Sequence, residues 1–272
     1  MNMKILRTSF CVALAALMFS CSSEEPAPIP DLQPKLPGST ENHVKSIIHS
    51  GNIEGCYDWN FTYKDSRLIS ATGTLYNPTT VAIQYTSNLL YSPDTVGVKN
   101  TGDLAMKVVL NSDKCIEYLL VNKDEYRFVY SEGRLVSWNK TIKDLNFGAE
   151  ALHAYGTIEY SDGDIATITY AENNDDPTYY RCTPTAIYNT DGLLPETLSK
   201  QMGCFGFEHL YYAGLLGKAT KHLVKTIQID YPDEAKKDDY SVEFRYSTNK
   251  SDQIELCTFI LNDEAVSVNY VY

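Results

Sequence analysis

The residue whose chemistry is easiest to predict is Cys21, because of the segment in front of it. The chain opens with a basic stretch and an apolar run that ends in a small residue and a cysteine: Lys4, Arg7, Phe10–Phe19, Ser20 and Cys21. A basic start and an apolar run too short to span a bilayer are typical of a secretory signal. The small residue before the cysteine fits cleavage there and transfer of acyl chains, such as palmitate, to the new N-terminus. We therefore predict a lipoprotein signal peptide over residues 1–20 and a lipid anchor on Cys21.

The residues after Cys21 carry a second signal. Residues 21–25 read Cys-Ser-Ser-Glu-Glu, and acidic residues directly after a lipidated cysteine resemble the export signal of Bacteroidetes lipoproteins displayed on the outer membrane. The prediction is an outer-membrane lipoprotein exposed at the cell surface; the alternatives are solvated linker residues and retention on the inner leaflet. Five prolines lie within residues 22–41, so residues 21–41 are expected to form the lipidated cysteine and a semi-extended tether.

Other reactive residue types lack the spacing that chemistry requires. Gly217-Lys218 resembles the end of a phosphate-binding loop, but Ala219 follows the lysine and Tyr212 stands where the pattern needs glycine. The sequence has no Gly-x-Ser-x-Gly motif, so an α/β-hydrolase is not supported. The histidines and cysteines show no metal-ligand spacing. We therefore predict no catalytic residue, no metal site and no cofactor.

Five cysteines remain outside the signal and the anchor: Cys56, Cys115, Cys182, Cys204 and Cys257. An odd number excludes a complete set of disulfides within one chain. One or two bridges are compatible with an exported protein. We expect mostly buried free thiols, which pack as small apolar side chains.

Binding chemistry is better represented than catalysis. Trp59, Trp138, Tyr179 and Tyr180 have rings that can stack on a sugar or line an apolar channel; the alternative is that they are core residues or cross-strand pairs. Hydrolysis of a glycan would need two carboxylates facing each other across a cleft, and the acids here cluster in turns. The prediction is a non-enzymatic protein that binds an apolar or saccharide ligand, or an envelope protein; the alternative is a glycan-processing hydrolase.

The elements expected to position these residues are strands. Apolar and polar residues alternate over 226–231, 241–246 and 266–272, which indicates strands with one buried face. One stretch differs, since residues 208–217 have apolar residues at helical spacing before Gly217. We expect one short helix near 207–217.

The turns repeat as well. Three segments share a layout in which a tyrosine ends one strand, an acid with Gly or Ser makes the turn, and an aliphatic residue starts the next: Tyr63–Leu68, Tyr130–Leu135 and Tyr160–Ile165. Tyr188–Leu193 is the same unit with one extra residue. Such residues suit tight hairpins. The sequence predicts a mainly β fold, with residues 42–272 forming a single antiparallel meander of a dozen or more strands, curled or half closed as a barrel.

Charge limits the partners. The chain has 23 basic and 35 acidic residues, and removal of residues 1–20 takes away Lys4 and Arg7 but no acid, leaving a net charge of −14. This acidity argues against a nucleic-acid partner. The membrane partner is expected to be reached through the lipid on Cys21, and the oligomeric state is left open.

The hairpins and one further segment resemble known sequences. The Tyr-x-acid-Gly-Arg-Leu units resemble the YD-type repeats of extracellular β proteins. The segment Tyr212–Ile227 is similar to one in a family of Bacteroidetes lipoproteins of unknown function with a porin-like β fold, and the resemblance covers residues 42–272. It implies a curved antiparallel meander, curled or half closed as a barrel. It implies no activity, and no catalytic residue is carried over.

Overall fold

The computed structural model describes residues 43–50, 57–75, 83–101, 106–143, 150–173, 175–232 and 240–272. All of these described residues belong to one compact unit. The predicted signal peptide, the anchor Cys21, the tether and Cys56 lie outside the described residues.

The described residues form a mainly β fold with one short helix, α1, at His209–Tyr212. Seventeen strands make up a single sheet, which confirms the predicted fold class. The strands are β1 (Ser46–Ser50), β2 (Tyr57–Lys64), β3 (Arg67–Leu75), β4 (Ile83–Tyr91), β5 (Thr95–Asn100), β6 (Met106–Leu110), β7 (Ile116–Val121), β8 (Asp124–Ser131), β9 (Arg134–Lys143), β10 (Glu150–Ser161), β11 (Asp164–Glu172), β12 (Thr178–Tyr188), β13 (His222–Asp230), β14 (Tyr240–Glu243), β15 (Arg245–Thr248), β16 (Ile254–Leu261) and β17 (Glu264–Val271).

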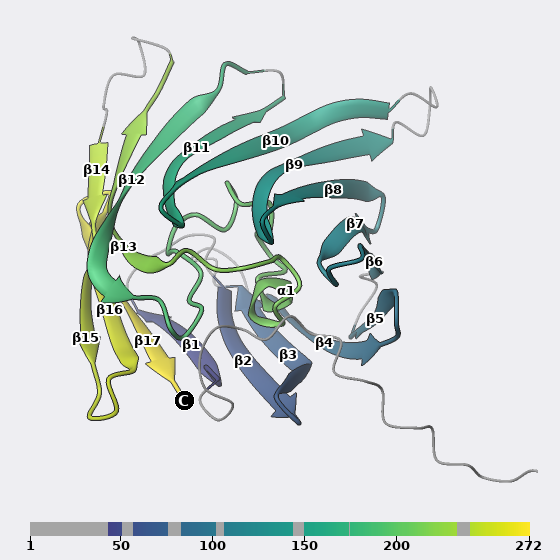
Figure 1. Ribbon diagram of the computed structural model, residues 1–272, viewed down its shortest axis with the longest axis horizontal. Coiled ribbons are helices and arrows are strands. Elements are labelled where there is room, and N and C mark those ends of the chain that lie inside the picture. Colours follow the sequence, from purple (N-terminus) through teal and green to yellow (C-terminus); the bar gives the residue numbers. More distant parts are fainter. Residues whose placement is uncertain are drawn as a thin grey trace, which may run out of the picture. The chain divides into compact units, whose positions relative to one another are not determined.

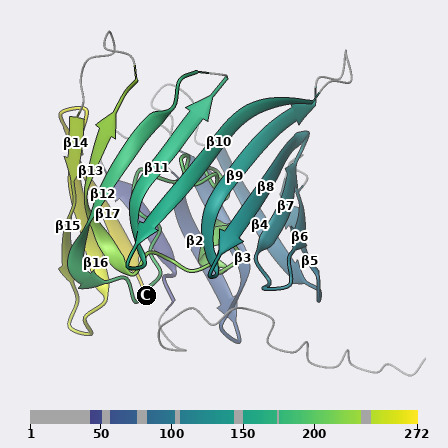
Figure 2. The same ribbon diagram turned by 45° about the horizontal axis from the view of Figure 1, so that its top comes forward.

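The sheet is an antiparallel meander that curls back on itself (Figures 1 and 2). β1 pairs with β17 on one side and with β2 on the other, which joins the two ends of the meander. β14 pairs with β13, and β15 pairs with β16, so the chain changes its partner strand at Phe244, the single residue between them, whose N–H still donates to the Lys225 carbonyl of β13 at 2.8 Å. The result is a nearly closed barrel, which removes most of the exposed strand edges.

The three hairpins with the repeated layout are confirmed. Their turns lie between β2 and β3, β8 and β9, and β10 and β11, and their central residues have positive φ angles: Asp65 and Ser66, Glu132 and Gly133, and Asp162 and Gly163. The fourth predicted hairpin, Tyr188–Leu193, is wrong. After β12 the chain turns inward, because Asn189 bonds both the N–H and the C=O of Leu193 (2.8 Å each) and starts a long connection.

That connection, residues 189–221, fills the barrel and is called the plug. In Figure 1 its helix α1 lies inside the ring of strands. Most of its apolar side chains are buried, among them Leu198, Leu210 and Leu215, which are at most 1% exposed. The helix predicted near 207–217 is confirmed in place but is only one turn long, since Gly214 and Gly217 adopt positive φ angles. The curled sheet therefore encloses its own chain where an open concavity was expected.

Specific contacts fix the plug to the wall. The indole N–H of Trp138 on β9 donates to the Gln201 carbonyl at 2.7 Å. Near the other end, Asp164 accepts bonds from the Thr220 hydroxyl at 3.3 Å and from the His222 N–H at 2.6 Å. The four cysteines that the structure describes are buried free thiols, as expected: Cys115, Cys182, Cys204 and Cys257. Among the described residues no helix has the length and hydropathy needed to cross a membrane.

Candidate functional site

The plug leaves a cavity of about 400 Å³ along the inner face of β1 and β2. Its walls come from these two strands, from the first half of the plug and from Leu261 at the end of β16. The lining combines an aromatic group with an ionisable group. The aromatic residues of the lining are Tyr57, Trp59, Phe205 and Tyr212. The ionisable residues of the lining are His49, Glu196, Lys200 and Glu208.

We call Tyr57, Trp59 and Phe205 the aromatic wall of the cavity. The two-residue period of β2 explains why its first two members lie together. Tyr57 and Trp59 are two residues apart and therefore project from the same face of the strand. Trp59 lies flat on Gly73, its partner on β3, where a Cβ atom would come within 2.8 Å of the indole ring. Ring centroids are 5.7 Å apart for both Trp59–Tyr57 and Tyr57–Phe205. Because Trp59 is 2% and Phe205 41% exposed, the wall runs from the interior to the surface.

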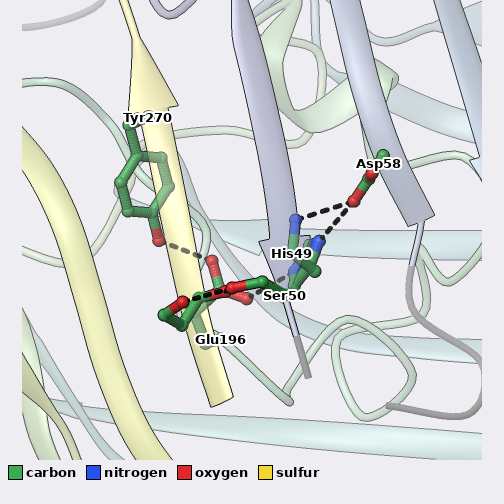
Figure 3. A network of polar contacts seen from close by, with 6 residues as sticks. His49, Ser50, Asp58, Glu196 and Tyr270 are labelled. Carbon is green, nitrogen blue, oxygen red and sulfur yellow. Dashed lines mark hydrogen bonds and ion pairs between the residues drawn. The ribbon is translucent and has the colours of Figure 1, made fainter. Parts of the chain in front are cut away.

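A polar network borders this wall (Figure 3). His49 on β1 contacts Asp58 Oδ1 through Nδ1 at 3.1 Å and Glu196 Oε2 through Nε2 at 3.3 Å. The Tyr270 hydroxyl on β17 donates to Glu196 Oε1 at 2.5 Å. Both carboxylate oxygens of Glu196 are thus engaged, which pins the start of the plug to the wall. The hydroxyls of Ser50 and Ser267 pair beside this network.

The charge of His49 is set by its two carboxylate partners. Burial alone would lower its pKa, but the hydrogen bonds and charges of Asp58 and Glu196 raise the pKa of His49 to about 9. The imidazole is therefore protonated at neutral pH. One positive charge lies between two carboxylates, so the network as a whole is negative.

Glu208, which directly precedes α1 and makes no side-chain capping bond to it, is the most deeply buried carboxyl of the cavity, with 6% exposed. Its Oε1 accepts the Gly206 N–H at 3.1 Å, whereas Oε2 has no hydrogen-bond partner among the described residues. Burial raises the pKa of Glu208 to about 7, against the opposing effects of backbone N–H groups, Ser199 and the charge of His49. This carboxyl can donate a proton or accept a hydrogen bond at neutral pH.

Two neighbouring bases contribute little free charge to the cavity. Burial lowers the pKa of His209 to about 3, so this ring, 5.0 Å from that of Trp59, is neutral. The ammonium of Lys200 is paired with Glu172 at 2.8 Å and lies over the Tyr170 ring at 5.6 Å from its centroid.

The aromatic residues singled out in the sequence are separated in the structure. Trp59 lines the cavity. Trp138 and Tyr180 are buried on either side of Gln201, whose side-chain amide donates to the Tyr180 hydroxyl at 3.1 Å. Tyr179 is 39% exposed and is absent from the cavity lining.

Sequence reasoning singled out only Trp59 among the residues of the site, and it missed the ionisable residues His49, Glu196 and Glu208 as well as the other aromatic residues of the lining. His49 and Glu196 are 147 positions apart and meet only through the closure of the barrel and the entry of the plug. Glu208 carried a local signal, since it is the single acid at the start of an otherwise apolar helical stretch. When such an apolar stretch packs into the interior of the protein, an acid at its start is buried with it.

A nearly closed antiparallel sheet around an internal plug is a porin-like β fold. Residues 74–255 match a family described as a domain of unknown function (DUF4595) with porin-like fold, and the chain belongs to this family, as the resemblance predicted. A porin-like protein from Bacteroides uniformis has a similar crystal structure, with a TM-score of 0.65, 15% sequence identity, and coverage of 84% of this chain and 97% of that one. No curated protein sequence matches this chain.

Proposed function

We propose that this protein is an outer-membrane lipoprotein, displayed at the cell surface, that binds a small apolar or saccharide ligand in the cavity between β1, β2 and the plug. The observation that carries the proposal is the aromatic wall of Tyr57, Trp59 and Phe205, which leads from the surface to a buried carboxyl. Aromatic faces joined to a few convergent polar groups are the usual composition of small-molecule sites. The segment around Cys21 supports the anchor.

The chain offers an internal control for testing this proposal. It has two tryptophans, of which Trp59 lines the cavity and Trp138 is held by the plug backbone. Titration with cyclohexanol or with methyl glucoside should shift the indole N–H resonance of Trp59 more than that of Trp138. If neither compound moves the Trp59 resonance, the proposed site is wrong for both ligand classes.

A pair of surface aromatics gives a matched comparison. Phe205 and Tyr179 are 41% and 39% exposed, but only Phe205 lines the cavity. Loss of an aromatic contact is worth about 1 kcal/mol, so Phe205→Ala should weaken binding of whichever probe binds by roughly fivefold. Tyr179→Ala should leave it unchanged. Equal effects of the two substitutions would contradict binding in the cavity.

A glycan-processing hydrolase is the second candidate, because Glu196 and Glu208 line the same cavity and the pKa of buried Glu208 is about 7. Such an enzyme needs a second carboxylate that is free to act as a base or nucleophile. Both oxygens of Glu196 are engaged by Tyr270 and His49, so we favour binding without hydrolysis. Release of the aglycone from aryl glycosides by the wild type, and its loss in Glu208→Gln, would reverse that preference.

A further inference from the structure

Glu208 presents a buried acceptor to the cavity. Its Oε2 atom is buried and has no hydrogen bond of good geometry among the described residues, although a contact with the Ser199 side chain lowers the pKa of this carboxyl, and Oε1 is held by the Gly206 N–H. A buried acceptor that stays unpaired is unfavourable, and native proteins rarely keep one without a reason. A ligand that donates a hydrogen bond to Oε2 would remove this deficit.

The charges around the cavity favour a donor that is also a cation. Among the residues that the structure describes, His49 is the protonated base that contacts the polar network, and it lies between the carboxylates of Asp58 and Glu196. The ammonium of Lys200 is paired with Glu172. Ionisation of Glu208 therefore adds a further negative charge to a lining whose positive charges are already matched.

The aromatic wall is also suited to a cation. Trp59 and Tyr57 lie with ring centroids 5.7 Å apart and an interplanar angle of 28°, and both line the cavity together with Glu208. The faces of Trp and Tyr rings attract ammonium groups, most strongly where water is excluded. A carboxylate beside aromatic faces is a common way to recognise an amine.

We propose that the ligand of this cavity carries an ammonium group, which pairs with the carboxylate of Glu208 beside the rings of Tyr57 and Trp59. The inference rests on the proposed function, because it requires the cavity to be a ligand site. The rest of the ligand is an apolar or sugar-like ring of a size that about 400 Å³ admits.

Binding of an ammonium ligand should depend on pH through the ionisation of Glu208 alone. The groups that interact electrostatically with it are His49 on β1, Tyr57 on β2, and Cys204 and Tyr212 in the plug. Burial raises the pKa of both tyrosines and of the thiol above their usual values, and the pKa of His49 is about 9. Of these groups, only Glu208 changes charge between about pH 5 and pH 8.

The test compares cyclohexylamine with cyclohexanol, which differ in the ammonium and share the ring. A primary alkylamine stays protonated up to about pH 10. Its affinity for the wild type should rise about tenfold per pH unit below about pH 7 and level off above, because binding requires ionised Glu208. The affinity for cyclohexanol should change with pH far less over this range, because the alcohol carries no charge.

The matched variants are Glu208→Gln and Glu125→Gln, since Glu125 is a buried glutamate of β8 outside the cavity lining. Glu208→Gln should weaken binding of the amine at about pH 8 by at least about tenfold and abolish its pH dependence. Glu125→Gln should behave as the wild type. Proton release on amine binding, measured by calorimetry in two buffers, tests the same coupling in the wild type without any variant.

Each outcome has a definite meaning. Equal affinity for amine and alcohol, or an amine affinity that does not change with pH, would overturn the ammonium assignment and leave the ligand site in place. Absence of binding by both compounds, with the Trp59 resonance unmoved, would overturn the assignment together with the proposed function.

Discussion

At the residue scale, burial decides what the ionisable groups of the cavity do. His49 and His209 are both buried histidines, yet one has carboxylate partners and a pKa of about 9, while the other packs against Trp59 and has a pKa of about 3. Glu208 has the same burial without an opposing cation in direct contact. These differences have consequences for stability that can be measured residue by residue.

Glu208→Gln should stabilise the protein in alkaline solution. The pKa of Glu208 is about 7 in the folded state and ordinarily 4.5, so the folded protein binds more protons between these values and its free energy of unfolding falls as pH rises through them. Removing the carboxyl should raise the free energy of unfolding by up to about 3 kcal/mol at about pH 8, with no gain at about pH 4. Urea unfolding at both pH values measures this, with the exposed Glu132→Gln as control. A gain that is the same at both pH values would contradict the buried-carboxyl explanation.

His209→Leu should make the protein more resistant to acid. The pKa of His209 is lowered by burial from 6.5 to about 3, so the unfolded chain binds more protons between these values and stability declines as pH falls through that window. The wild type should lose roughly 4 kcal/mol from this group by about pH 3, and the variant should not. Unfolding curves followed by circular dichroism from neutral to acid pH give the comparison, normalised to each protein at neutral pH. An unchanged pH dependence would show that His209 is not held neutral.

At the scale of elements, the plug and the wall are fitted to each other around Trp138. A Cβ atom on Gly203 would collide with the indole ring, and one on Gly156, the strand partner of Trp138, would collide with the same ring from the wall. The close approach lets the indole N–H reach the Gln201 carbonyl. The glycine in the plug is therefore required by packing as well as by its positive φ angle.

Gly203→Ala and Gly206→Ala separate these two requirements. Both glycines have positive φ angles, 70° and 83°, but a Cβ on Gly206 meets nothing closer than the Tyr57 hydroxyl at 3.6 Å. Gly206→Ala should cost about 1 kcal/mol of backbone strain. Gly203→Ala adds a clash with a buried ring and should cost about 3 kcal/mol or more in total. Thermal unfolding of the two variants side by side measures the difference, and equal losses would contradict the packing role of Trp138.

The plug is also the element that the sequence could not predict. The three confirmed hairpins depend on neighbouring residues such as Glu132 and Gly133, whose φ angles are 53° and 76° and whose preference for tight turns is local. The Tyr188 unit has the same local signal, but contacts with distant strands override it. Trp138 and Gln201 are 63 positions apart. A cavity between wall and plug depends on such pairs, so the sequence offered aromatic candidates and only Trp59 among them lines it.

At the scale of the whole molecule, closure of the barrel brings the site together. β1 supplies His49, β2 supplies Tyr57 and Trp59, and β17 supplies Tyr270; β1 pairs with both of the other strands. The plug is pinned to this same region through Glu196. The cavity therefore lies where the two ends of the meander meet, and a change in that pairing would alter the cavity and the closure together.

The location of the molecule is the remaining prediction at this scale, and it depends on Cys21, outside the described residues. Cys21→Ser removes the thiol that would carry the acyl chains, and stable anchoring needs more than one such chain. We expect the variant to be lost from the membrane fraction as a mature lipoprotein and to accumulate as a precursor that retains residues 1–20. Fractionation followed by intact mass measurement checks both points.

Cys11→Ser, within the apolar run of the signal, is the matched control and should be processed and anchored normally. A Cys21→Ser protein that is cleaved and anchored like the wild type would remove the anchor from the proposed function and leave the cavity as the site to be explained.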